Sequence, residues 1–183
     1  IGDYSMKMWG LYVFQWNGNW NVVHQDWPGV TPGDNITMQG KMMSLSTDSI
    51  SGSNNAWLEL EFLDASGTSL GESFNVGSRY FTNDDPLDKW LPFSIQTTVP
   101  ENAATARAKL VYFQDDSTDG SNTYYPGSVY FDDIHVEYNY LSNPGFESGS
   151  VDCNWTNENQ TVVEDAGFMG NHYSNNWGGY FND

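Results

Sequence analysis

The stretch Ser128-Val-Tyr-Phe-Asp-Asp-Ile-His-Val-Glu-Tyr-Asn-Tyr-Leu-Ser-Asn-Pro-Gly-Phe-Glu147 decides the fold of this 183-residue chain. Its first half carries four apolar residues in two alternating pairs, Val129 with Phe131 and Ile134 with Val136. The pairs are in opposite phase. Because side chains of a regular strand alternate between its faces, all four can enter one core only if the strand bulges. We therefore expect a strand that closes a β-domain, with a bulge at Asp132-Asp133 that aims carboxylates at one spot.

The second half of the stretch, Asn143-Pro-Gly-Phe-Glu147, has the form of an opening segment. Together with the closing strand and with Gln25-Asp-Trp-Pro-Gly-Val-Thr-Pro-Gly33, it resembles carbohydrate-binding modules of families 4, 9, 16 and 22, over roughly residues 1–147. The resemblance implies a jelly roll with a structural calcium ion where the closing strand meets the opening segment. The ligands it implies are Asp132, Asp133 and Glu147, since calcium takes oxygen ligands. The alternative interpretation is a solvated acidic turn.

The remaining composition and periodicity also favour strands. Aromatic residues make up 16% of the chain, and Gly, Asn, Ser, Asp and Thr are abundant, which is typical of short strands joined by polar turns. Asn35–Met43 and Trp57–Leu63 alternate as strands do. Ala104–Phe113 suits a helix by propensity and a strand by alternation, and we predict a strand because its neighbours are strands. The sequence thus predicts an all-β fold, a two-sheet antiparallel sandwich of the jelly-roll type.

The charge of the chain is strongly negative. Six basic residues face 24 acidic ones, for a formal net charge of -18. Such a surface repels nucleic acid and anionic membranes and suits neutral ligands, although it is equally typical of an ordinary extracellular protein. No apolar run approaches the roughly 20 residues that span a bilayer, so we expect no membrane insertion. We expect an extracellular or cell-surface location.

Aromatic residues in or beside the predicted loops are candidates for binding sugar. Sugar rings stack their C–H faces on aromatic rings, and their hydroxyls need polar partners. The alternative for each ring is a place in the core. The candidate rings are Trp16, Trp20, Trp27, Tyr80, Trp90, Tyr124 and Tyr125, and the candidate polar partners are Gln25, Arg79 and Gln114.

The sequence gives little support for catalysis. His24, His135 and His172 are isolated, and the chain has no nucleophile elbow, phosphate loop or zinc-protease motif. A pair of carboxylates at the spacing of a glycoside hydrolase is expected by chance among 24 acidic residues. We therefore expect a protein that is not an enzyme.

A short internal repeat bears on the domain organisation. Gly2-Asp-Tyr-Ser5 and Trp9-Gly-Leu-Tyr12 recur as Gly170-Asn-His-Tyr-Ser174 and Trp177-Gly-Gly-Tyr180, an offset of 168 residues. We predict that residues 1–141 form a module without its opening strand, and that residues 142–183 are the opening strands of the next repeat. That tail would complete its own module, complete a neighbour's by strand donation, or begin an incomplete repeat.

Two functions follow from these patterns. The first is non-catalytic, extracellular binding of a neutral polysaccharide that stacks on loop and groove aromatics, with calcium as a structural ion. The alternative is a structural repeat of a surface fibre, adhesin or surface layer, built by head-to-tail self-assembly through strand donation.

Overall fold

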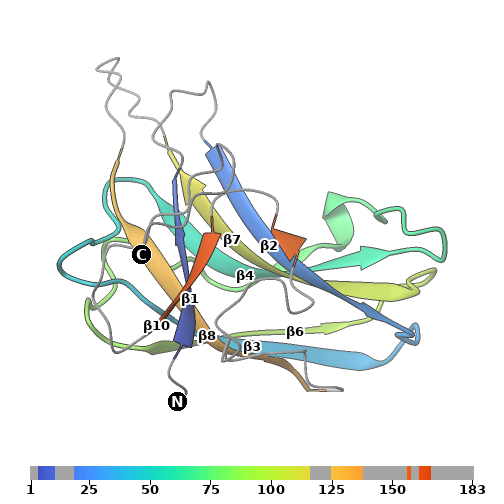
Figure 1. Cartoon of the computed structure of the whole chain (residues 1–183). Coiled ribbons are helices and arrows are strands. Elements are labelled where there is room, and N and C mark those ends of the chain that lie inside the picture. Colours follow the sequence, from blue (N-terminus) through green and yellow to red (C-terminus); the bar gives the residue numbers. More distant parts are fainter. Residues whose placement is uncertain (1–3, 11–18, 116–124, 138–155, 158–160, 166–183) are drawn as a thin grey trace.

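In the computed structural model, the described part of the chain forms two antiparallel sheets of five strands each, which face one another (Figure 1). The structure describes residues 4–10, 19–115, 125–137, 156–157 and 161–165. Sheet A has the order β10 (Thr161–Asp165), β1 (Tyr4–Trp9), β8 (Ser128–Val136), β3 (Asn35–Met43) and β6 (Leu91–Thr98). Sheet B has the order β5 (Val76–Gly77), β4 (Asn55–Leu63), β7 (Thr105–Gln114), β2 (Asn19–Pro28) and β9 (Thr156–Asn157). The predicted all-β sandwich is thus confirmed.

The core lies between the two sheets and is filled by alternate residues of each strand. The segment that suited both a helix and a strand is strand β7, which pairs with β2 on one side and β4 on the other. Its alternation decides the outcome, because a central strand buries one face completely. The inward side chains include Met6, Met8, Met38, Met42, Leu58, Leu60, Phe62, Ala106, Ala108 and Leu110, each at most 1% exposed.

The bulge predicted in the closing strand is present in β8. Val129, Phe131, Ile134 and Val136 are all buried, at most 2% exposed. The register between β3 and β8 pairs Gln39 with His135 but Lys41 with Asp132, so Asp133 and Ile134 both lie opposite Gly40. Asp133 takes a left-handed backbone conformation with φ 51°. The extra residue restores the phase, and so both apolar pairs face the core.

The described residues of the segment 142–183 form two short strands. β10 pairs with β1 from Tyr4 to Met8, and β9 pairs with Val23 and His24 of β2. β10 lies outside β1 and not beside β8, whose neighbours are β1 and β3. The division of the chain at residue 141, and the question of which module the tail completes, stay predictions.

The one helical element among the described residues is the short 3-10 helix η1 (Glu72–Phe74). In that part of the chain, no helix is long and apolar enough to cross a membrane.

Candidate functional site

The outer face of sheet B is built from the residues that alternate with the core residues of three strands. Their pairing sets them in four rows: Trp20–Phe113–Asn55, Val22–Val111–Trp57, His24–Lys109–Glu59 and Asp26–Arg107–Glu61. The first two rows are mostly aromatic and aliphatic, and the last two are charged. One sheet face therefore carries an apolar half and a polar half side by side.

Four rings form what we call the aromatic surface: Trp20, Trp57, Tyr80 and Phe113. Trp20 packs on Phe113 at 4.7 Å between ring centroids and meets Trp57 at 5.5 Å with an interplanar angle of 86°. Trp57 in turn meets Tyr80 at 5.0 Å and 67°. Tyr80 reaches this place because its neighbour Phe81 bridges to Ala56 at the side of β4. Edge-to-face contacts of this kind are favourable and hold the rings in fixed orientations.

The rings differ sharply in exposure. Trp57 is only 6% exposed, whereas Trp20 is 52% and Tyr80 56% exposed. The buried indole of Trp57 thus holds two exposed rings apart, with its Nε1 donating to Glu59 Oε2 at 3.1 Å. Large, solvent-exposed rings that pack against a buried residue on a sheet face are typical of a binding surface.

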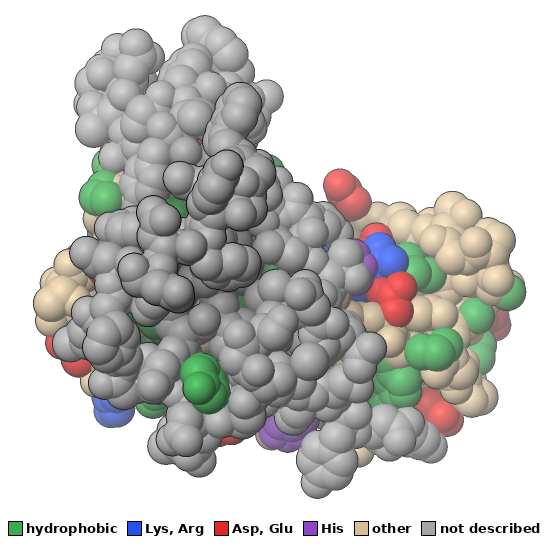
Figure 2. All heavy atoms as spheres, viewed as in Figure 1, with side chains coloured by type: hydrophobic (Ala, Val, Ile, Leu, Met, Phe, Trp, Pro, Cys, Tyr) green, Lys and Arg blue, Asp and Glu red, His purple; other side chains and the backbone are tan. Residues whose placement is uncertain are grey.

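The charged rows form what we call the ion-pair ladder, from Asp26 through Arg107, Glu61 and Lys109 to Glu59. Arg107 donates to both Asp26 carboxylate oxygens, at 2.6 and 3.0 Å, and lies 3.7 Å from Glu61 Oε2. Lys109 Nζ lies 3.2 Å from Glu61 and 3.0 Å from Glu59. Each cation therefore lies between two carboxylates. In Figure 2, a basic group likewise lies directly beside acidic groups on the right of the view.

These contacts change the protonation of the groups in the ladder. The hydrogen bond from Arg107 holds the pKa of the Asp26 carboxyl below its usual value, although partial burial opposes the shift. Burial lowers the pKa of the Lys109 ammonium, but the charges of Glu59 and then Glu61 outweigh it, and the net pKa is raised. Both groups, the Asp26 carboxylate and the Lys109 ammonium, are thus held in their charged forms at neutral pH.

Not all the predicted ligand-binding residues lie on this surface. Gln25 and Gln114 are turned into the sandwich, at 6% and 1% exposure. Gln114 Nε2 donates to the backbone oxygen of Tyr125 at 2.9 Å, so its amide serves a buried network at one end of the sandwich. Because alternate residues of a strand point to opposite faces, neither amide is on the same face as Trp20. The structure does not bring them together with the exposed rings.

Other predicted residues lie at the ends and edges of the sandwich. Trp27 is half-buried and lines a pocket of about 190 Å³ beside the turn after β2. Arg79 lies over the Phe93 ring at 4.2 Å and pairs with Asp85 at 3.0 Å. Trp90 is half-buried just before β6. Tyr125 is half-buried as well.

Three predicted residues, Trp16, Tyr124 and Glu147, lie outside the described residues. Conversely, the structure adds Trp57 and Phe113, which the sequence analysis passed over because both lie inside strands. The alternation of side chains along a strand could have indicated their position: because Leu58 and Leu60 face inward, Trp57 must face outward.

The predicted acidic pair lies in two environments. Asp132 is 1% exposed, and its Oδ1 accepts a hydrogen bond from the Asp133 backbone N–H at 2.7 Å. The Asp133 carboxylate is 2.6 Å from Lys41 Nζ, so an ammonium already neutralises it. Among the described residues, no group of three or more His, Cys, Asp or Glu side chains could hold a metal. These residues alone do not fit a calcium shell of six to eight oxygens, and calcium stays a prediction that depends on Asp132 and Glu147.

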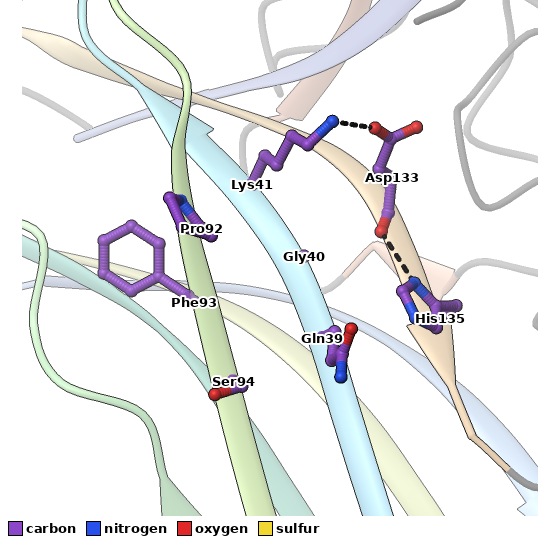
Figure 3. Close-up of a pocket in the computed structure, with 8 residues that line it drawn as sticks. All are labelled: Gln39, Gly40, Lys41, Pro92, Phe93, Ser94, Asp133 and His135. Carbon is purple, nitrogen blue, oxygen red and sulfur yellow. Dashed lines mark hydrogen bonds and ion pairs between the residues drawn. The ribbon is translucent and has the colours of Figure 1, made fainter.

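A second hollow lies on the outer face of sheet A, across β6, β3 and β8 (Figure 3). Its volume is about 650 Å³. Side chains of Gln39, Lys41, Asp133 and His135 lie along it (Figure 3). We call it the sheet A groove. The apolar Pro92 and Phe93 line it together with these polar side chains.

The sequence matches no protein-family model and no curated protein. Its fold is similar to parts of solved structures, at low identity. The enzymatically active domain of bacteriophage CBA120 tailspike protein 4 matches with a TM-score of 0.45 and 11% identity, over 73% of this chain and 19% of that one. The C-terminal domain of EclA, a sugar-binding protein, matches with a TM-score of 0.43 and 10% identity, over 72% and 76%.

The C-terminal family 22 carbohydrate-binding module of Clostridium thermocellum Xyn10B matches with a TM-score of 0.38 and 13% identity, over 73% of this chain and 85% of that one. All these TM-scores are below 0.5, and so the function has to be argued from the surface of this chain itself.

Proposed function

We propose that this chain is a non-catalytic module that binds a neutral polysaccharide on the outer face of sheet B. The observation that carries the proposal is the pair of exposed rings, Trp20 at 52% and Tyr80 at 56%, mounted on the buried Trp57. Water wets these rings poorly, and the apolar faces of sugar rings are suitable partners for them. Because Trp57 fixes their positions, little conformational entropy is lost on binding.

The ion-pair ladder next to the rings supplies polar partners for sugar hydroxyls. Carboxylates of Asp26, Glu59 and Glu61 accept hydrogen bonds, and Arg107 and Lys109 donate them. An anionic polysaccharide would compete with the carboxylates that already bind each cation, and it would approach a chain of net charge -18. These charges favour an uncharged ligand.

The location that suits this function is the cell exterior, where polysaccharides are found. The acidic surface and the absence of a motif for catalysis support an extracellular or cell-surface binding module. A structural calcium ion is part of the same proposal, and its test is given in the Discussion.

Replacing the exposed rings tests the proposal. We expect Trp20→Ala and Tyr80→Ala each to weaken retention on soluble neutral polysaccharides in affinity gel electrophoresis, by about thirty-fold or roughly 2 kcal/mol per ring. The fold should survive, because both rings are largely exposed. Phe74→Ala is the matched control: Phe74 is 45% exposed on η1 and packs on none of the four rings in the described structure. Equal retention of all three variants and the wild type would refute the proposal.

A further inference from the structure

The sheet A groove lies on the opposite sheet from the aromatic surface and shares no residue with it. Three neighbouring strands line it, with Pro92 and Ser94 from β6, Gln39 and Lys41 from β3, and Asp133 and His135 from β8. Its volume of about 650 Å³ is within the usual range for ligand sites, about 300–1,000 Å³. The groove is therefore large enough to hold part of a ligand chain.

The bulge in β8 positions the charged groups of the groove. Asp133 takes a positive φ, which few residues other than glycine adopt and which Asp and Asn tolerate best. On the inner side, a Cβ on Gly40 would lie 2.4 Å from Ile134 Cδ1, so glycine opposite the bulge lets Ile134 enter the core. As a result the Asp133 carboxylate reaches Lys41 Nζ at 2.6 Å, as Figure 3 shows. Bulges and strained residues are frequent at binding sites.

The polar groups of the groove suit hydroxyl groups. Lys41 can only donate and Asp133 can only accept, and both side chains are 38% exposed. A hydroxyl beside them can accept from the ammonium and donate to the carboxylate. Within the described residues, the Gln39 amide and the Ser94 hydroxyl have no hydrogen-bond partner, and both are exposed. Nδ1 of His135 lies 3.2 Å from the Asp133 carbonyl oxygen, and in the tautomer with the proton on Nδ1 the Nε2 atom accepts hydrogen bonds.

The charges of the groove select an uncharged ligand. Lys41 and Asp133 neutralise one another, and the chain as a whole carries -18. An anionic ligand therefore finds no unpaired cation here, and a cationic one finds no unpaired carboxylate. We propose that the sheet A groove is a second binding site, for an uncharged glycan, so that one module can hold a glycan chain on each sheet. This inference stands on residues separate from those of the proposed function.

The test follows backbone amide resonances by NMR while the whole chain is titrated in turn with cellohexaose, xylohexaose and mannohexaose. We expect the amides of Gln39, Lys41 and Ser94 to shift with at least one probe, and the shifts to persist in Trp20→Ala/Tyr80→Ala. Shifts confined to sheet B, or none in the groove with any probe, would overturn the inference. Shifts in the groove without any on sheet B would support it and contradict the proposed function.

A charge-neutral variant tests the residues themselves. In Lys41→Gln/Asp133→Asn, Asn tolerates the positive φ, so the bulge is kept. We expect about a tenfold loss of affinity in the groove, measured by calorimetric titration, because hydrogen bonds to charged groups are lost. The control, Lys89→Gln/Asp84→Asn, makes the same changes on an exposed loop and should have no effect.

An affinity of the groove that is unchanged in Lys41→Gln/Asp133→Asn would overturn the inference. Should that variant fail to fold, Gln39→Ala changes an exposed side chain that the sandwich does not need. It should weaken the shifts in the groove, and shifts equal to the wild type would count against the site.

Discussion

At the scale of single residues, Gly40 and Ile134 show how packing inside the sandwich shapes its outer surface. The bulge turns Ile134 inward against Gly40, and this same backbone conformation places Asp133 beside Lys41 outside. The sequence was sufficient to predict the bulge, because two pairs of apolar residues in opposite phase need one. It could not predict the partner of Asp133, because that depends on which strand lies beside β8.

Gly40→Ala should destabilise the protein by about 1–3 kcal/mol, since its Cβ would lie 2.4 Å from Ile134 Cδ1 and overpack the core. Ile134→Val removes that δ-carbon. In urea unfolding, the double variant should therefore lose less stability than the sum of the two single variants. Additive losses would mean that the contact does not decide the role of Gly40.

Among the described residues, the calcium prediction now depends on Asp132, because Asp133 is paired with Lys41. An ion bound only by the native state raises the melting temperature, so chelation should lower it. We expect Asp132→Asn to remove the difference between thermal melts in calcium and in chelator, and Asp133→Asn to keep it. Equal melting of the wild type in both buffers would contradict a calcium site.

At the scale of elements, β2, β7 and β4 decide the candidate site through their register. Trp20 and Tyr80 could be chosen from the sequence as rings near loops, and both are exposed. Gln25 and Gln114 could not be excluded in advance, because alternation gives two faces without saying which one meets the other sheet. Trp57 could be assigned to the site only from the pairing of β4 with β7, since this register places it beside Trp20.

The same register makes stability sensitive to acid. The pKa of Asp26 is lowered in the folded state, chiefly by its hydrogen bond from Arg107, so this contribution is complete above the unfolded pKa near 3.8 and is lost as pH falls through the folded value. Arg107→Gln should thus cost about 1 kcal/mol or less in chemical denaturation at pH 6, because the pair is partly exposed. The difference from the wild type should shrink as pH falls below the unfolded pKa near 3.8. A difference that is constant with pH would contradict the assignment.

At the scale of the whole molecule, the tail contributes to the edge of sheet A. β10 pairs with β1 from Tyr4 to Met8, and without it β1 becomes an edge strand with unpaired backbone groups. Exposed edges are costly and invite pairing with other chains, which is how the alternative function in a fibre would arise. The short repeat at an offset of 168 residues could indicate this join from the sequence, but not whether pairing occurs within or between chains.

Deleting residues 142–183 should therefore lower the melting temperature and promote self-association, measured by calorimetry and analytical ultracentrifugation. Deleting residues 166–183 keeps β10 and is the matched control. If the chain that ends at residue 141 stays monomeric and its melting temperature is unchanged, the tail does not complete a sandwich, either within one chain or between chains.

The binding of a neutral glycan at the exposed rings is tested most directly by the indole N–H resonances of the tryptophans during titration with neutral hexasaccharides. Trp20 is exposed and is the ring that we propose contacts the ligand, whereas the Trp57 indole is buried and hydrogen-bonded to Glu59. The Trp20 resonance should shift and saturate with the same dissociation constant as the binding measured by calorimetry, and Trp57 should shift less. A Trp20 resonance that stays fixed while a hexasaccharide binds, or no binding by any neutral probe, would contradict the proposed site on sheet B.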